Sequence, residues 1–173
     1  MKNDLLEELI TMKGTLKATF KFPKVSSIYY PAPTLLTMKD TDEAEREVLR
    51  KFFINTSRVI DFQFAGYPED RKVNDERKCV GLHYHFVIRS ENDRVFCNVA
   101  PRKFKAVLRQ VYGAYPNFIM PNEPLYLAPL DNSHHSEFDE KTYEEYCLKQ
   151  YCPNTKRLVT DKEFRVKKPR RVS

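Results

Sequence analysis

The hydrophobic and polar positions follow two different periods along the chain. Residues 15–22 (TLKATFKF) alternate polar and apolar side chains, which indicates a strand with one buried face. Residues 58–65 and 82–89 also have the character of strands, and the charged, turn-rich segment between them indicates an antiparallel hairpin with a long loop. A short apolar run at residues 125–130 predicts another strand.

Four other segments are predicted to be helices. Residues 3–12 group several large aliphatic side chains, and the helix predicted at residues 40–54 has an acidic first turn, which favours a helix N-terminus. Residues 101–112 carry apolar side chains at helical spacing, and Pro101 suits a first turn. Residues 139–151 form the fourth predicted helix. The side chains of the second helix that are predicted to face the core are Ala44, Val48, Leu49, Phe52 and Phe53.

The length of the chain indicates one compact domain. A chain of 173 residues can bury a sizeable core, and we expect this domain to span residues 1–153. The run RVKKPRR at residues 165–171 is basic and has no apolar periodicity. Residues 154–173 are therefore predicted to form a basic linker or tail.

Composition and charge narrow the function classes. Four glycines and no G-x-x-x-x-G-K-S/T pattern exclude ATP binding through a P-loop. The net charge of +6 lowers the cost of approaching a polyanion such as nucleic acid. No apolar run approaches 18 residues and no signal peptide is evident, so we expect no membrane segment and an intracellular location. The four cysteines show no C-x-x-C spacing, which favours reduced thiols over a zinc site.

The segment around His83 and His85 carries the most informative chemistry. Side chains two positions apart in a strand project to the same side, about 7 Å apart along the strand. Two imidazoles on one face can hold a divalent cation if a third ligand comes from a neighbouring strand. The alternative is a solvent-facing strand with two ordinary histidines.

The preceding predicted strand offers two candidates for the third ligand. One of its faces is apolar, and the other carries Asp61 and Gln63, the oxygen donors of this strand. We favour Gln63 and keep Asp61 as the alternative, because strand register is not readable from the sequence. A three-ligand site with open positions suits Mg²⁺ or Mn²⁺ acting as a Lewis acid on a phosphate.

The last predicted helix supplies a candidate nucleophile. Tyr146 and Lys149 are three residues apart and share a helix face. A tyrosine hydroxylate can attack a metal-polarised phosphate and leave a 5′-phosphotyrosine and a free 3′-OH. Lys149 would hold the phosphate, orient the metal-bound group or lower the tyrosine pKa. Tyr143 is a candidate second nucleophile, a base-stacking residue or a core residue. The structural alternative makes Tyr146 a half-buried aromatic and pairs Lys149 with Glu145.

Basic side chains could track the phosphates of a nucleic acid. They fall in two groups, one on the helix after the histidines and one in the long hairpin loop. The helix group is Arg102, Lys103, Lys105 and Arg109, and the loop group is Arg71, Lys72, Arg77 and Lys78.

These motifs together resemble the HUH endonuclease superfamily, in which a hydrophobic-His-x-His strand precedes a Tyr-x-x-Lys-type helix. The matching segments are Leu82-His83-Tyr84-His85 and Tyr146-Cys147-Leu148-Lys149. The order of elements is most similar to viral rolling-circle or rolling-hairpin initiators, including parvovirus-type Rep nickases, over roughly residues 15–152. The parvovirus pattern would carry an acidic metal ligand just after Phe64, and Ala65 stands there instead.

The resemblance implies an α+β fold, with a central antiparallel sheet of about five strands flanked by helices. It implies origin-specific binding, metal-dependent nicking and joining of single-stranded DNA, and a helicase domain beyond the basic tail. The expected partners are single-stranded DNA and duplex origin DNA, and oligomerisation is compatible with a longer protein. A viral protein of a eukaryotic host would act in the nucleus. The alternatives are a non-cleaving DNA- or RNA-binding module of the same fold, a transposase or relaxase of a mobile element, and a structural domain.

Overall fold

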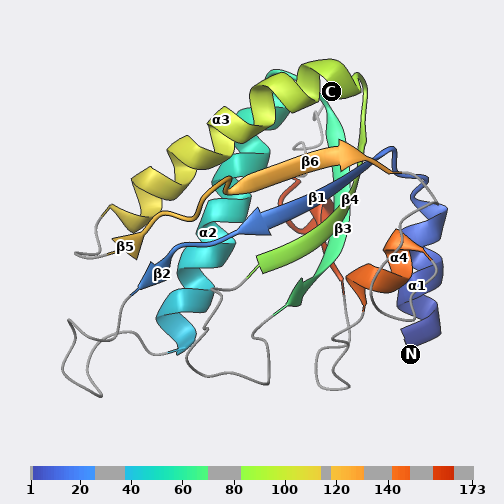
Figure 1. Ribbon diagram of the computed structural model, residues 1–173, viewed down its shortest axis with the longest axis horizontal. Helices are drawn as coiled ribbons and strands as arrows, with labels where there is room; N and C mark the ends of the chain where they lie inside the picture. The colour runs from blue at the N-terminus through green and yellow to red at the C-terminus, as the bar shows by residue number, and fades with distance from the viewer. Residues whose placement is uncertain are drawn as a thin grey trace, which may run out of the picture.

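A five-stranded antiparallel sheet forms the centre of the chain, as the computed structural model shows (Figure 1). The strands lie in the order β6-β1-β4-β3-β7, and a second, two-stranded sheet pairs β2 with β5. The structure describes residues 2–25, 38–69, 83–113, 118–130, 142–148 and 158–165. The strand bounds are β1 (Leu16–Lys21), β2 (Lys24–Val25), β3 (Phe62–Glu69), β4 (His83–Ser90), β5 (Phe118–Ile119), β6 (Leu125–Pro129) and β7 (Val159–Thr160).

Helices cover both faces of the large sheet (Figure 1). The long helices α2 (Met38–Ser57) and α3 (Asp93–Tyr112) pack on one face, and α1 (Lys2–Thr11) and α4 (Tyr143–Cys147) pack on the other. Successive side chains of β4 point to opposite faces of the sheet and contribute to both cores. Phe86 and Ile88 belong to the core under α2 and α3, and Val87 belongs to the core under α1 and α4. The predicted α+β fold with a central antiparallel sheet is confirmed.

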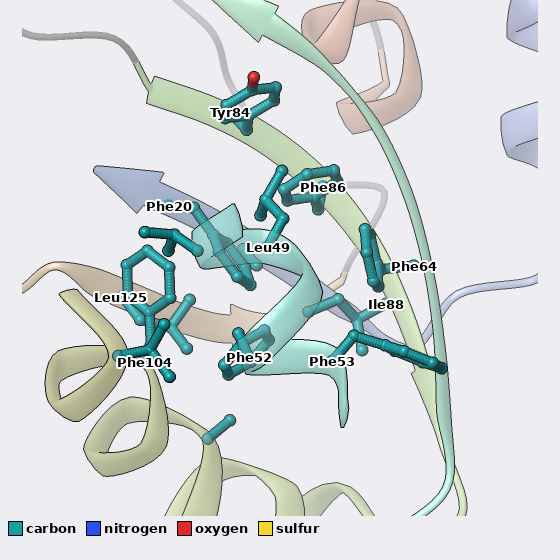
Figure 2. Packing of buried hydrophobic residues seen from close by; sticks show 14 of the residues in the cluster. Phe20, Leu49, Phe52, Phe53, Phe64, Tyr84, Phe86, Ile88, Phe104 and Leu125 are labelled. Carbon is teal, nitrogen blue, oxygen red and sulfur yellow. The ribbon is translucent and has the colours of Figure 1, made fainter. Parts of the chain in front are cut away.

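The larger core is built from aromatic rings in edge-to-face contact (Figure 2). The ring of Phe20 in β1 lies 5.2 Å from Phe52 in α2, 4.9 Å from Phe86 in β4 and 4.8 Å from Phe104 in α3, measured between centroids. Such contacts add to the stabilisation from area burial. This cluster therefore packs both long helices against β1 and β4.

Most predicted elements are confirmed, with boundaries shifted by a few residues. The strands predicted at 15–22, 82–89 and 125–130 correspond to β1, β4 and β6, and the first two predicted helices correspond to α1 and α2. All five side chains that were predicted to face the core from α2 are buried.

The strand predicted at residues 58–65 lies four residues further along the chain. The turn that closes α2 takes up the first predicted positions, since the N–H groups of Val59 and Ile60 both donate to the carbonyl of Thr56. The strand continues through Gly66 and Pro68. Glycine is needed at position 66 because a Cβ there would collide with the carbonyl oxygen of His85 on β4. Pro68 lies two residues beyond Gly66, the last β3 residue that pairs with β7 in the described part of the chain.

Helix α3 begins at Asp93, eight residues before its predicted start. The side chain of Asn92 accepts a hydrogen bond from the N–H of Val95 at 3.2 Å and caps the helix. Phe96 and Ala100 continue the buried face toward the N-terminus. The prediction that Pro101 lies in the first turn is therefore wrong, and this proline lies inside the helix.

Helix α4 begins at Tyr143, later than predicted. Thr142 has an extended backbone, and its hydroxyl accepts a hydrogen bond from the N–H of Glu145, so it is the N-cap. The helix ends at Cys147. The remaining residues of the predicted helix, 139–141 and 149–151, lie outside the described ranges.

The prediction that residues 154–173 form a linker is wrong for residues 158–165. Strand β7 pairs with Ala65 and Gly66 as the fifth strand, and a short 3-10 helix, η3 (Asp161–Glu163), follows it. The buried carboxylate of Asp161 accepts hydrogen bonds from the N–H of Phe64 at 3.0 Å and from Nε of Arg165 at 2.6 Å. These residues belong to the folded domain, and residues 166–173 lie outside the described ranges. No described helix has the length and apolar character needed to cross a membrane.

Candidate active site

His83 and His85 project from the central strand toward the face that carries α1 and α4. Strand β4 pairs with β1 on one side and with β3 on the other. The two imidazole rings lie 5.1 Å apart between centroids and are nearly perpendicular. His85 is only 6% exposed, whereas His83 is partly exposed. The predicted placement of both histidines on one strand face is confirmed.

Thr19 orients the inner histidine from the neighbouring strand. It is the register partner of His85 on β1, and its hydroxyl lies 3.3 Å from Nδ1 of that ring. A hydrogen bond at one ring nitrogen selects the nitrogen that can bind a metal ion and fixes the ring plane. In the tautomer with the proton on Nδ1, that nitrogen donates to the Thr19 hydroxyl and Nε2 is the nitrogen that can bind a metal ion. The sequence motifs did not single out Thr19, although its place on the polar parity of residues 15–22 is the signal that puts it on this face.

Tyr146 reaches the histidines from α4. Its ring centroid lies 4.9 Å from that of His85, with the ring planes at 68°. The side chain is partly buried and packs against the smaller core between α1, α4 and the sheet. The structure thus brings together the predicted nucleophile and one of the predicted metal ligands. Lys149, the other predicted residue of this motif, lies outside the described residues.

Tyr143 anchors α4 to the sheet. Its hydroxyl donates to the carbonyl oxygens of Ala18 on β1 and Phe86 on β4, at 2.9 and 3.1 Å. The side chain is 3% exposed, and burial raises the pKa of the Tyr143 hydroxyl well above its ordinary value, with the adjacent Cys147 raising it further. The prediction that Tyr143 is a second catalytic tyrosine is therefore wrong. It is a core residue, and its fixed hydroxyl holds Tyr146 one helical turn away.

The register of β3 corrects the predicted third ligand. Gln63 pairs with Arg89, whereas the partners of His85 and His83 are Tyr67 and Glu69. Four residues separate Gln63 from Tyr67, which corresponds to roughly 13 Å along a strand. Gln63 therefore cannot join the histidines around one ion.

Asp61 is also excluded as a ligand of the histidine pair. It precedes β3, farther from the histidines than Gln63, and its carboxylate lies 3.6 Å from the guanidinium of Arg165. Among the side chains that the structure describes, which do not include that of Glu69, no three or more His, Cys, Asp or Glu residues are arranged to bind a metal.

A surface pocket of about 690 Å³ lies beside Gln63, away from the histidines. Its walls come from α1, β3 and the β7–η3 segment, and they carry acidic and basic side chains together, including Asp4, Glu7, Glu8, Lys162 and Arg165. His83, His85 and Tyr146 do not line this pocket. This hollow beside the sheet is thus distinct from the histidine–tyrosine site.

The basic residues of α3 lie on the other layer of the molecule. Arg102, Lys105 and Arg109 are exposed, and Lys103 is partly exposed. Helix α3 packs on the face of the sheet opposite the histidines, so these cations cannot contact the phosphate that the histidine site would hold. The helix has no acidic residue after Asp93, and its exposed Arg94 is a further cation that lies before the predicted start of the helix. The loop residues Arg71, Lys72, Arg77 and Lys78 lie outside the described ranges.

A scan of protein families and searches of curated proteins and of solved structures find no match to this chain. Two imidazoles and a phenol converge on one face of a rigid sheet, and this combination suits metal-assisted transfer of a phosphoryl group to tyrosine.

Proposed function

We propose that this chain is an HUH-type nickase, a metal-dependent endonuclease that cleaves single-stranded DNA through a covalent tyrosine intermediate. The observation that carries the proposal is the 4.9 Å separation between the rings of Tyr146 and His85. Tyr146 lies in α4 and His85 in β4, so tertiary packing brings together two residues that are distant in the sequence. The resemblance of both motifs to the HUH superfamily supports the same assignment.

His83 and His85 would hold the divalent cation, Mg²⁺ or Mn²⁺, together with Glu69. We propose Glu69 from the backbone register alone, in which it is the Cα partner of His83. A carboxylate is also a better ligand for these hard cations than an amide. The bound cation would act as a Lewis acid on a non-bridging oxygen of the scissile phosphate.

Tyr146 is the proposed nucleophile. Its hydroxyl oxygen forms a bond to phosphorus while the bond from phosphorus to the 3′ oxygen breaks. The phenol proton is released to solvent, and the departing 3′ oxygen takes up a proton to become a free 3′-OH. Joining is the reverse reaction, in which a 3′-OH attacks the phosphotyrosine and releases Tyr146.

Thr19 and Tyr143 act as positioning residues. Thr19 contacts His85, and Tyr143 anchors α4. Lys149 remains the proposed cation that holds the phosphate.

A second candidate function is DNA binding without cleavage. The observation in its favour is the basic surface of α3, which lies on the layer opposite the histidine site. This surface would bind DNA phosphates whether or not the other layer performs chemistry. The same experiment distinguishes the two functions.

The test uses a pool of end-labelled, single-stranded oligonucleotides of random sequence, incubated with the protein and Mn²⁺. The nickase is expected to yield shortened labelled strands and a covalent protein–DNA adduct that survives denaturation, and EDTA is expected to abolish both. Tyr146→Phe should abolish the adduct. The matched control is Tyr112→Phe, which removes a tyrosine hydroxyl from α3 on the opposite face of the sheet and should still form the adduct. Binding without any adduct would support the second candidate and reject the nickase.

A further inference from the structure

An exposed aromatic ring lies on the histidine face of the sheet, on the edge strand β6. Tyr126 is 45% exposed, and it is the sole aromatic among the large hydrophobic side chains that are exposed in the described part of the chain. Its register partner on β1 is Thr19, which is also the partner of His85. Tyr126, Thr19 and His85 therefore form one row across three neighbouring strands, with Tyr126 about 10 Å from His85 at the spacing of strands.

A lysine lies next to the same row. Lys21 of β1 is the register partner of His83. Alternate residues of β1, Leu16, Ala18 and Phe20, are buried in the core under α2 and α3, so Lys21 projects to the histidine face. Lys21 is a diagonal neighbour of Tyr126 across the β1–β6 pair, a relationship that places side chains roughly 7–8 Å apart. Neither β1 nor β6 contains an acidic residue.

An exposed ring beside a cation matches the repeating chemistry of a single nucleic-acid strand. Single strands expose base faces that stack on aromatic side chains, and their phosphates bind lysine. A duplex hides its base faces and would contact the lysine alone. The absence of carboxylates on β1 and β6 removes the repulsion that a polyanion would otherwise meet on these strands.

We propose that Lys21 and Tyr126 form a strand subsite, in which Lys21 binds a phosphate adjacent to the scissile one and Tyr126 stacks on an unpaired base. The identification of the strand as DNA entering a nicking centre rests on the proposed function. The subsite would hold the strand across β1 and β6 and direct its backbone toward His83 and Tyr146. Cleavage would then select unpaired DNA, because only an unpaired base can reach the Tyr126 ring.

The test measures strand binding without cleavage, in the full chain with Tyr146→Phe and with EDTA present. Fluorescence anisotropy compares labelled dT15 with an abasic strand of the same length and charge. Tyr126→Ala is expected to weaken dT15 binding by roughly 5-fold to 100-fold and to leave abasic-strand binding unchanged, because stacking is lost. Tyr126→Phe should retain the preference for dT15. Ile10→Ala is the control for loss of an exposed apolar side chain elsewhere.

The lysine has a separate signature. Lys21→Gln is expected to weaken both strands and to reduce the slope of log affinity against log salt by about 0.7, the value for one neutralised phosphate in a single strand. Lys21→Arg should restore the slope, and Lys162→Gln, which removes an exposed charge from η3, should change neither strand.

Two results would overturn the strand subsite. One is unchanged dT15 binding in Tyr126→Ala, and the other is an equal loss for dT15 and the abasic strand. The proposed nickase activity can be rejected independently of the strand subsite. If the native protein, which retains Tyr146, formed no covalent adduct, the preference for dT15 over the abasic strand would still be expected. Conversely, adduct formation that tolerates both Tyr126→Ala and Lys21→Gln, with dT15 binding unchanged, would reject the subsite and retain the nickase.

Discussion

The hydroxyl of Tyr143 donates to the carbonyl oxygens of two neighbouring strands, and one of these carbonyls belongs to Phe86, the residue after His85. This contact ties α4 to the strand that carries the histidines. Tyr146 stacks beside Tyr143 with centroids 6.1 Å apart and continues to His85. A buried tyrosine therefore sets the position of the proposed nucleophile, and the two tyrosines of one helix have different roles.

The burial of Tyr143 predicts a loss of stability at high pH. Its pKa is raised in the folded state, so the folded protein retains this proton after the unfolded chain has released it. The contribution is fully present below about pH 10 and declines as pH rises from there through the folded pKa, at up to about 1.4 kcal/mol per pH unit. Urea unfolding of the native protein and of Tyr143→Phe between pH 8 and 11 measures the difference. Equal pH slopes for the two proteins would contradict this account.

Thr19 is predicted to control metal affinity through His85. Thr19→Val removes the hydroxyl beside Nδ1, so the imidazole ring loses the contact that holds its orientation from β1. Removal of such a supporting group typically weakens metal binding 10-fold to 100-fold. Calorimetric titration with Mn²⁺ checks this, and Thr19→Ser should bind as the native protein does. If Thr19→Val bound Mn²⁺ normally, His85 would need another orienting group.

The third ligand is testable by comparing three residues of one chain segment. Glu69→Gln is expected to abolish Mn²⁺ binding and adduct formation, because it removes the proposed carboxylate ligand at the register position of His83. Gln63→Ala and Asp61→Asn should leave both unchanged, since these residues lie away from the histidines. Adduct yield and bound Mn²⁺ are measured on the same preparations. A loss of binding in Gln63→Ala with normal binding in Glu69→Gln would reverse the assignment.

The basic surface of α3 is predicted to bind duplex DNA independently of the histidine site. Replacing Arg102, Lys105 and Arg109 by Gln should reduce the slope of log affinity against log salt by about 0.9 for each phosphate that the variant no longer neutralises. Formation of the tyrosine adduct on a short single strand should stay near the native level, because α3 lies on the other face of the sheet. A parallel loss of both activities would show that the two surfaces contact one continuous DNA path.

The periodicity of the chain was sufficient for the features that depend on neighbours in sequence. Alternation alone placed His83 and His85 on one face, and helical spacing identified the buried side of α2. Periodicity did not predict elements that depend on contacts between residues distant in the chain. The two-residue strand β7 is too short to show a period, and only its pairing with β3 makes it part of the sheet.

The sequence by itself determined the α+β class and the grouping of the two histidines, because these follow from local backbone geometry and from which side chains avoid water. Tertiary structure decided which residues of other elements lie next to the two histidines. Sliding β3 along β4 leaves the alternation of each strand unchanged, so only the pairing across the sheet could put Glu69, and not Gln63, opposite the histidine pair. Likewise, Tyr143 and Tyr146 share a residue type and a helix, and only packing against β1 and β4 separated the buried anchor from the residue beside His85.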